Sequence, residues 1–262
     1  MPHLASSPLS LLAIGNTIGK RILILLTIHF LLAADGRAAP PPVGTRIASI
    51  TKEEINPSDK LPLEELPTPD SGKDVLAIIF SGDGGWRDLD RDFGDLFQQK
   101  GIATVGFDCL KYFWEPRQPA KVASDLATIL RYYLKAWGKK RVMLVGYSFG
   151  ASWLPLLVNR LPTELQNQIS LVVLLAPGQY TNVEIKMGDW ISDIRRPGAL
   201  DVTEPAAALR HPILCVYGTE EQDDSLCPKL KGINRRLMPV PGGHHFNNDY
   251  APIENAILQY FE

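Results

Sequence analysis

Residues 141–150 read RVMLVGYSFG, and this stretch decides the fold because an apolar run passes directly into the pattern Gly-x-Ser-x-Gly. An unbroken apolar run predicts a strand that is buried on both faces. The residues that follow, 151–159, have helical character. A serine between such a strand and a helix occupies a tight turn that projects its oxygen above the sheet. The pattern therefore favours Ser148 as a nucleophile over a purely structural turn.

The sequence on either side of this turn alternates between strand and helix. Apolar runs predict strands at residues 74–80, 102–107, 141–146, 171–175, 213–217 and 236–240. Amphipathic spacing predicts helices at residues 88–100, 120–137, 151–159 and 253–261. This order predicts an α/β fold with a mostly parallel central sheet, helices on both faces and no large cap domain. Residues 175–206 have no place in the alternation and are a candidate to fold over the end of the sheet.

The composition is that of an ordinary globular protein. The chain has 262 residues, of which 45% are hydrophobic and 21% are charged, and its formal net charge is −2. These values exclude a disordered chain, a collagen-like repeat and a small disulfide-rich scaffold. Because the charge balance offers no basic surface, we expect no direct binding of nucleic acid.

The N-terminal residues have the features of a secretory signal. Lys20 and Arg21 precede the apolar run 22–34, ILILLTIHFLLAA, which has the length of a signal-peptide core. Small residues make a cleavage site after Ala38, and an anchor that is never cut is the alternative. We expect a signal peptide at residues 1–38, a linker or edge segment at 39–72 with one strand at 46–51, and the main domain at 73–262.

Export places the cysteines in an oxidising compartment, where disulfides persist. Cys215 and Cys227 bracket one junction of strand and loop, so they are the expected pair, and Cys109 is expected to stay a buried free thiol. No short C-x-x-C spacing is present, which argues against a zinc site. Nothing in the sequence requires a metal or an organic cofactor.

A serine hydroxyl needs a base, and on this architecture an acid and then a histidine follow the serine along the chain. Residues 242–246, GGHHF, follow the last short strand, so His244 is the candidate base and His245 the alternative, which is expected to pack locally. The acid belongs in residues 218–224, GTEEQDD. Glu221 suits the usual loop geometry, while Asp223 is favoured because the shorter carboxylate is the commoner partner of histidine.

Two backbone amides are needed to stabilise an oxyanion. One is the amide of Phe149, which follows the serine at a helix N-terminus. The second is expected from the loop after the first core strand, residues 81–86, SGDGGW, whose glycines allow close approach. Asp83 and Gly84 are the candidates for this second donor.

Four motifs in this order resemble one family. They are residues 81–92 (SGDGGWRDLDRD), 110–116 (LKYFWEP), 146–152 (GYSFGAS) and 241–246 (PGGHHF). Together they are similar to the bacterial virulence protein VirJ and to the C-terminal domain of its relative AcvB, over about residues 73–262. In the family an acid often follows GYSFGA, where this chain has Ser152.

The resemblance implies an α/β-hydrolase fold, a periplasmic location, Ser148 as nucleophile and His244 as base. AcvB-type members are implicated in hydrolysis of lysyl-phosphatidylglycerol, which implies an aminoacylated phospholipid substrate at the membrane surface. VirJ is linked to virulence and type IV secretion, which implies secretion-system proteins as partners. A non-catalytic accessory factor, or a carboxylesterase or lipase with another substrate, are the alternative functions.

Acidic residues near the predicted site suit a cationic headgroup. Asp83, Asp88 and Asp90 lie in or just after the oxyanion loop, and residues 220–224 lie on the acid loop. An acidic rim attracts an ammonium group, although ordinary surface charge, or a helix N-terminus for Asp88 and Asp90, explains them as well. Four tryptophans are candidates either for an apolar wall or for the core, namely Trp86, Trp114, Trp153 and Trp190.

Overall fold

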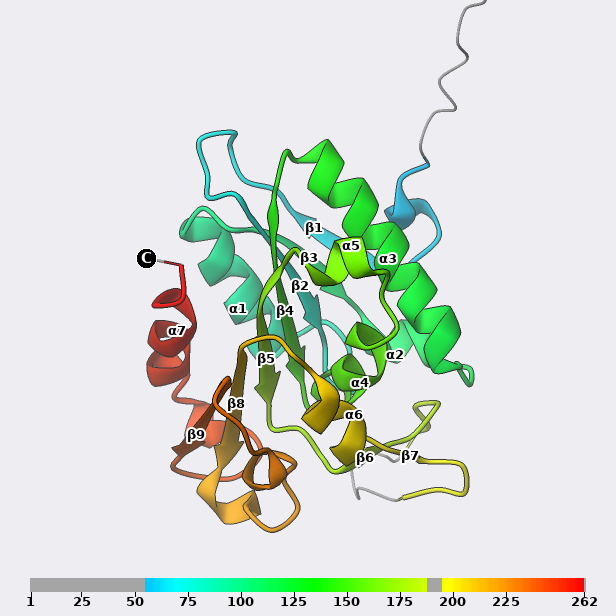
Figure 1. Cartoon of the computed structure of the whole chain (residues 1–262), viewed down its shortest axis with the longest axis vertical. Coiled ribbons are helices and arrows are strands. Elements are labelled where there is room, and N and C mark those ends of the chain that lie inside the picture. The colour runs from blue at the N-terminus through cyan, green and yellow to red at the C-terminus, as the bar shows by residue number, and fades with distance from the viewer. Residues whose placement is uncertain (1–54, 188–194, 262) are drawn as a thin grey trace, which may run out of the picture. The chain divides into compact units, whose positions relative to one another are not determined.

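The described part of the chain, residues 55–187 and 195–261 of a computed structural model, is built around a seven-stranded sheet (Figure 1). The strand order is β1-β3-β2-β4-β5-β8-β9, and within this sheet β1 alone is antiparallel to its neighbour. The strands are β1 Leu63–Leu66, β2 Val75–Phe80, β3 Ala103–Phe107, β4 Arg141–Tyr147, β5 Ile169–Leu175, β8 Ile213–Gly218 and β9 Arg235–Val240. The predicted mostly parallel α/β sheet is confirmed.

Helices cover both faces of the sheet because successive side chains of a strand point to opposite sides. In β2, Leu76, Ile78 and Phe80 belong to one core cluster, and Val75 and Ile79 belong to the other. The helices α2, α3, α4 and α6 cover the face of the first cluster, and α1 and α7 cover the face of the second (Figure 1). The helices are α1 Asp88–Gln99, α2 Cys109–Tyr112, α3 Pro119–Ala136, α4 Phe149–Val158, α5 Thr163–Gln166, α6 Thr203–Ala208 and α7 Ala251–Leu258. None of the helices in the described ranges is long and apolar enough to cross a bilayer.

All predicted strands and helices within the described residues occur, with small shifts at their ends. Among the elements that the sequence missed, β1, α2 and α5 have four residues each and show no full period of apolar spacing. β1 is a half-exposed edge strand in register with β3, with Leu63 opposite Phe107. The predicted signal peptide at residues 1–38 and the predicted strand at 46–51 lie outside the described residues.

The described part of the segment between β5 and β8 lies mainly at the carboxyl end of the sheet, beside α4 (Figure 1). It contains a two-stranded antiparallel ribbon of β6 Tyr180–Thr181 and β7 Leu200–Asp201, followed by α6. The indole of Trp153 in α4 donates to the carbonyl of Asn182 at 3.1 Å. This bond ties the ribbon to the helix that follows Ser148.

A disulfide joins Cys215 in β8 to Cys227, and Cys109 is a buried free thiol, so both cysteine predictions are confirmed. The bond closes a loop of sequence separation 12 that leaves the carboxyl end of β8 and returns beside it. Everything between Gly218 and Leu226, including Glu221, lies within this covalent loop. The disulfide therefore restrains the predicted acid loop at both ends.

Replacing Cys215 and Cys227 together with alanine is expected to lower the free energy of unfolding by about 3 kcal/mol, because an open loop gives the unfolded chain more conformational entropy. Urea denaturation with and without reductant measures the change. Wild type in reductant should approach the double variant, and the double variant should not respond to reductant. Equal midpoints for oxidised wild type and the double variant contradict this account.

Candidate active site

Ser148 lies in a strained turn between β4 and α4. Its backbone has φ 53° and ψ −113°, a conformation that residues other than glycine rarely adopt. Only glycine fits two residues before Ser148 and two residues after it. A Cβ at Gly146 would lie 2.6 Å from the backbone of Ala151, and one at Gly150 would lie 2.4 Å from the carbonyl oxygen of Phe80. The pattern Gly-x-Ser-x-Gly is therefore the steric condition for this turn.

A continuous hydrogen-bonded chain joins Ser148, His244 and Glu221. Nε2 of His244 lies 2.7 Å from Oγ of Ser148, and Nδ1 of His244 lies 3.1 Å from Oε2 of Glu221. With a proton on Nδ1, the imidazole donates to the carboxylate and leaves Nε2 free to accept the serine proton. Three loops from the carboxyl ends of β4, β8 and β9 supply these side chains.

The structure brings Glu221, and not Asp223, to His244. Glu221 ends a short 3₁₀ turn, Thr219–Glu221, directly after β8. Asp223 is exposed, and its backbone carbonyl accepts a hydrogen bond from Nε2 of Gln179 at 2.9 Å. Of the two carboxylates that the sequence left open, Glu221 therefore occupies the position of the third triad member.

The acid loop and the histidine loop touch through their backbones. The amide of Glu220 donates to the carbonyl of Gly242 at 3.1 Å. A Cβ at Gly218 would lie 2.4 Å from the carbonyl oxygen of Gly243, so a glycine at the end of β8 is required for this close approach. The contact fixes the separation of Glu221 from His244.

His245 faces Tyr147 instead of Ser148. Its Nδ1 lies 2.8 Å from the hydroxyl of Tyr147, and that hydroxyl is also 3.3 Å from the carbonyl oxygen of His244. Burial raises the pKa of Tyr147 further above its ordinary value, and the hydroxyl is available as a donor. The pair fastens the histidine loop to the residue before Ser148, which is the local packing expected of His245.

The peptides that carry the Phe149 and Asp83 amides, the predicted oxyanion donors, lie next to Ser148. Phe149 is the first residue of α4, where a backbone N–H has no acceptor within the helix. The carbonyl of Gly82 accepts from the amide of Gly85 at 3.1 Å, within its own loop. Because C=O and N–H point in opposite directions across a trans peptide, the Asp83 amide points away from that turn. A Cβ at Gly82 would lie 3.8 Å from Cβ of Ser148, so this peptide is next to the serine.

Gly84 lies one step further along this loop. A Cβ at Gly84 would lie 3.1 Å from Nε of Arg87, so this residue faces the Arg87 side chain. Of the two donors that the sequence proposed, Asp83 is therefore better placed than Gly84.

Ser152 lies one helical turn after the nucleophile and is buried. Its hydroxyl donates to the carbonyl of Ser148 at 3.1 Å and accepts from the amide of Gly178 at 2.9 Å. It is buried on the inner side of α4. This is the position where the family's motif often carries an acid, and here its side chain links the serine turn to the loop after β5.

The predicted acidic rim is only partly exposed. Asp88 is exposed and forms an ion pair with Arg87 at 3.5 Å. The prediction that Asp90 lies on this rim is wrong, because Asp90 is only 3% exposed. Glu220, Asp223 and the neighbouring Asp224 are exposed on the acid loop.

The predicted tryptophan wall is divided between surface and core. Trp153 is fully buried and Trp86 packs over Gly94 and Gly106, so both belong to the core. Trp114 is 54% exposed. Its neighbour Phe113 is buried against Phe149, with ring centroids 5.0 Å apart. Trp190 lies outside the described residues.

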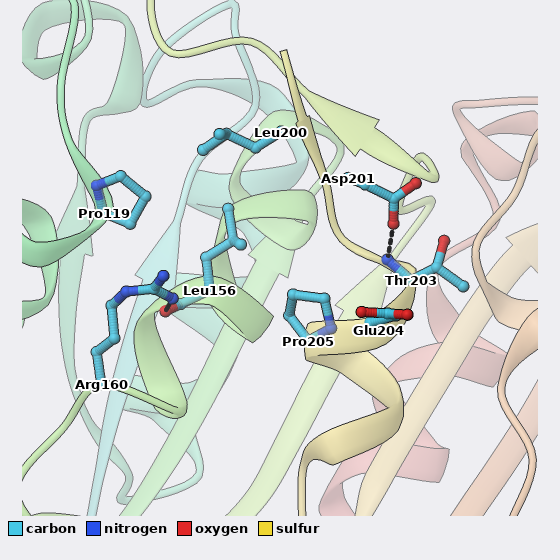
Figure 2. Close-up of a pocket in the computed structure, with 8 residues that line it drawn as sticks. All are labelled: Pro119, Leu156, Arg160, Leu200, Asp201, Thr203, Glu204 and Pro205. Carbon is cyan, nitrogen blue, oxygen red and sulfur yellow. Dashed lines mark hydrogen bonds between the residues drawn. The ribbon is translucent and has the colours of Figure 1, made fainter. Parts of the chain in front are cut away.

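A cavity on another part of the sheet's carboxyl end lies away from the triad. It has a volume of about 590 Å³ and lies between the starts of α3 and α6 and the C-terminal half of α4, with Leu156, Arg160 and Glu204 in its wall (Figure 2). None of Ser148, His244 and Glu221 lines it. Within the described ranges, no group of three or more His, Cys, Asp or Glu side chains is arranged to hold a metal ion.

The strand order and the strained serine turn at the carboxyl edge of a parallel sheet define the α/β-hydrolase fold. The chain belongs to the family of the bacterial virulence protein VirJ, because the model of that family matches residues 74–262. No functionally curated protein matches the chain in sequence.

Solved structures of low sequence identity share this fold. Est1E from Butyrivibrio proteoclasticus is 17% identical, with a TM-score of 0.54 over 76% of this chain and 93% of that chain. Esterase Pf2001 from Pyrococcus furiosus is 16% identical, with a TM-score of 0.54 over 79% and 95%. A lipase-esterase related protein from Clostridium acetobutylicum is 14% identical, with a TM-score of 0.54 over 76% and 99%. At sequence identities of 14% to 17%, the similarity to these structures shows that the fold is shared and shows no more.

Replacing Glu221 with glutamine is expected to lower kcat for p-nitrophenyl acetate by about 10³- to 10⁴-fold, because the imidazole loses both its orientation and the charge that stabilises its protonated form. Asp223→Asn is the matched control on the same loop and should keep kcat within about twofold, since Asp223 does not contact His244. Steady-state kinetics of both variants measure the difference. Equal losses in the two variants, or a loss in Asp223→Asn alone, contradict the assignment of the acid.

Proposed function

We propose that the protein is a serine esterase that works through an acyl-enzyme. The observation that carries the proposal is the hydrogen-bonded chain of Ser148, His244 and Glu221 in a turn built for an exposed nucleophile. A serine, a histidine and a glutamate that were not hydrogen-bonded to one another would not support an esterase. The esterases among proteins of the same fold are consistent with this class of reaction.

Each member of the site has a defined role in the proposed reaction. Oγ of Ser148 attacks the ester carbonyl while its proton passes to Nε2 of His244, and Glu221 stabilises the imidazolium. The amides of Phe149 and Asp83 stabilise the oxyanion of the tetrahedral intermediate. The imidazolium then protonates the departing alcohol. Water, deprotonated by the same imidazole, attacks the acyl-serine and releases the acid and free Ser148.

We infer that the ester is the aminoacyl, most simply lysyl, ester of phosphatidylglycerol. The resemblance of the motifs to AcvB-type proteins supports this substrate. The exposed carboxylates of Glu220, Asp223 and Asp224 support it as well, because they lie on the loop of Glu221 and attract a cationic acyl group. The acyl group transferred to Ser148 would be lysyl, and the alcohol released would be phosphatidylglycerol.

The periplasm is the proposed location. The apolar N-terminal run and the disulfide between Cys215 and Cys227 support export, since disulfides persist in oxidising compartments. Secretion-system proteins are candidate partners, and the only support for them is the link of the VirJ family to secretion. An ordered triad is not needed by a purely accessory factor, so catalysis is favoured over that alternative.

Ser148→Ala should lower kcat for release of lysine from lysyl-phosphatidylglycerol vesicles by about 10⁶-fold, because no other described group replaces the nucleophile. Labelling by a fluorophosphonate probe should disappear in the same variant. Ser124→Ala, at an exposed serine on α3, is the control and should leave both readings unchanged.

Two outcomes of this experiment count against the proposal in different ways. Undiminished lysine release by Ser148→Ala removes Ser148 from the reaction. Strong probe labelling of wild type together with no release of lysine retains the serine esterase and rejects the lysyl ester, in favour of a carboxylesterase or lipase of another substrate.

A further inference from the structure

Ser81 carries a buried hydroxyl in the oxyanion loop that the proposed reaction does not use. It follows β2 directly and is 0% exposed, so it is closed to solvent. A buried hydroxyl disfavours folding unless protein hydrogen bonds replace those it made to water. The hydrogen bonds of Ser81 lead from the end of β3 into the loop that carries the Asp83 amide.

Two hydrogen bonds fasten Ser81 to the chain that leaves β3. Its amide donates to the carbonyl of Phe107, the last residue of β3, at 3.1 Å. Its Oγ accepts from the amide of Cys109 at 2.9 Å. Cys109 is the first residue of α2, where a backbone N–H has no acceptor within the helix. Ser81 is therefore anchored at the carboxyl end of β3.

The hydroxyl proton of Ser81 is directed at the next residue. While its oxygen accepts from Cys109, Oγ of Ser81 donates to the carbonyl of Gly82 at 3.0 Å. The amide of Gly85 donates to the same carbonyl at 3.1 Å. Gly82 is buried, and these two donors satisfy both acceptor positions of its carbonyl. The direction of this carbonyl is therefore set from two sides.

The Gly82 carbonyl and the Asp83 amide belong to one peptide plane. Because a peptide is rigid and planar, a bond that fixes the direction of its C=O also fixes the direction of its N–H. A Cβ at Gly82 would lie 3.8 Å from Cβ of Ser148, so this peptide is next to the nucleophile. Rotation of the plane would turn the Asp83 amide relative to an oxyanion formed at Ser148.

We propose that Ser81 is a positioning residue, whose hydroxyl holds the Gly82 carbonyl and thereby aims the Asp83 amide at the oxyanion. This inference rests on the proposed serine esterase function. Ser81 touches no reacting atom, and its effect passes through the peptide between Gly82 and Asp83. A serine that only satisfied the first amide of α2 would affect stability and leave the transition state unchanged.

Replacing Ser81 with alanine removes the hydroxyl and its bond to the Gly82 carbonyl. We expect kcat for p-nitrophenyl acetate to fall about 10- to 100-fold, with KM within about threefold of wild type. This loss is smaller than that from removing an oxyanion donor, because the Asp83 amide is misdirected and not deleted. Ser81→Thr keeps a hydroxyl and should stay within about fivefold of wild type.

Thr104→Val is the matched control for the loss of a buried hydroxyl. Thr104 is also 0% exposed, and its Oγ1 donates to the carbonyl of Ile102 at 3.2 Å, near the amino end of β3. Loss of this bond should lower the melting temperature by about 2–4 °C and leave kcat unchanged. If Ser81→Ala has a similar melting temperature, its lower kcat is not a consequence of stability.

Hexyl trifluoromethyl ketone tests the oxyanion donors directly. Oγ of Ser148 adds reversibly to its carbonyl carbon while the serine proton passes to His244, which leaves an oxyanion where the tetrahedral intermediate has one. The inhibition constant of the ketone should rise in Ser81→Ala by about the same factor as kcat/KM falls. In Thr104→Val it should not change.

The measurements use the full chain below the melting transition of each variant, with active sites counted by fluorophosphonate labelling. A lower kcat and weaker binding of the ketone in Ser81→Ala, at unchanged KM, support the proposal. Wild-type kcat in Ser81→Ala overturns it, and so does a loss of kcat with unchanged affinity for the ketone. A folded Ser81→Thr variant that is as slow as Ser81→Ala also overturns it.

The Ser148→Ala variant distinguishes failure of this inference from failure of the proposed function. If Ser148→Ala is inactive and Ser81→Ala is fully active, the esterase stands and the role of Ser81 fails. If Ser148→Ala hydrolyses p-nitrophenyl acetate as fast as wild type, the esterase itself fails.

Discussion

The left-handed backbone of Ser148 is the constraint on which the rest of the site depends. A serine at φ 53° is unfavourable in isolation and persists because β4, α4 and the crowded glycines on both sides leave no other path for the chain. The amide of Ser148 is also held by the carbonyl of Leu175 at 2.8 Å, at the end of the adjacent strand. The hydroxyl is thereby directed outward at the carboxyl edge of the sheet, where the other loops can reach it.

The partners of Ser148 are held in part by contacts between loops. Gly218 and Gly243 bring the acid loop against the histidine loop, and Tyr147 fastens the histidine loop to the serine turn. Ser152 connects the same turn to the loop after β5. Each loop is therefore restrained by at least one other loop of the site. A change at one of them is expected to displace the others.

The sequence predicted the sheet and the serine turn well because both follow from local rules. Buried parallel strands appear as unbroken apolar runs, and the sterics of the turn demand glycine two residues before and after Ser148. The acid was ambiguous because residues 220–224 carry four carboxylates, and only the 3₁₀ turn after β8 decides which one faces His244. Asp90 was misplaced because its position at the start of a helix is equally compatible with solvent and with burial. The four-residue elements β1 and α2 were missed because they are too short to show a period.

The covalent link between Cys215 and Cys227 has a consequence for when the site can form. Glu221 belongs to a segment that both cysteines enclose, so the thiol state of the chain and the order of that segment are coupled. In a reducing environment the segment depends on weaker links, such as the bond from the Leu226 amide to the Pro177 carbonyl at 2.9 Å. The position of Glu221, the charge partner of the imidazole, is thus expected to be better defined once the two cysteines are joined.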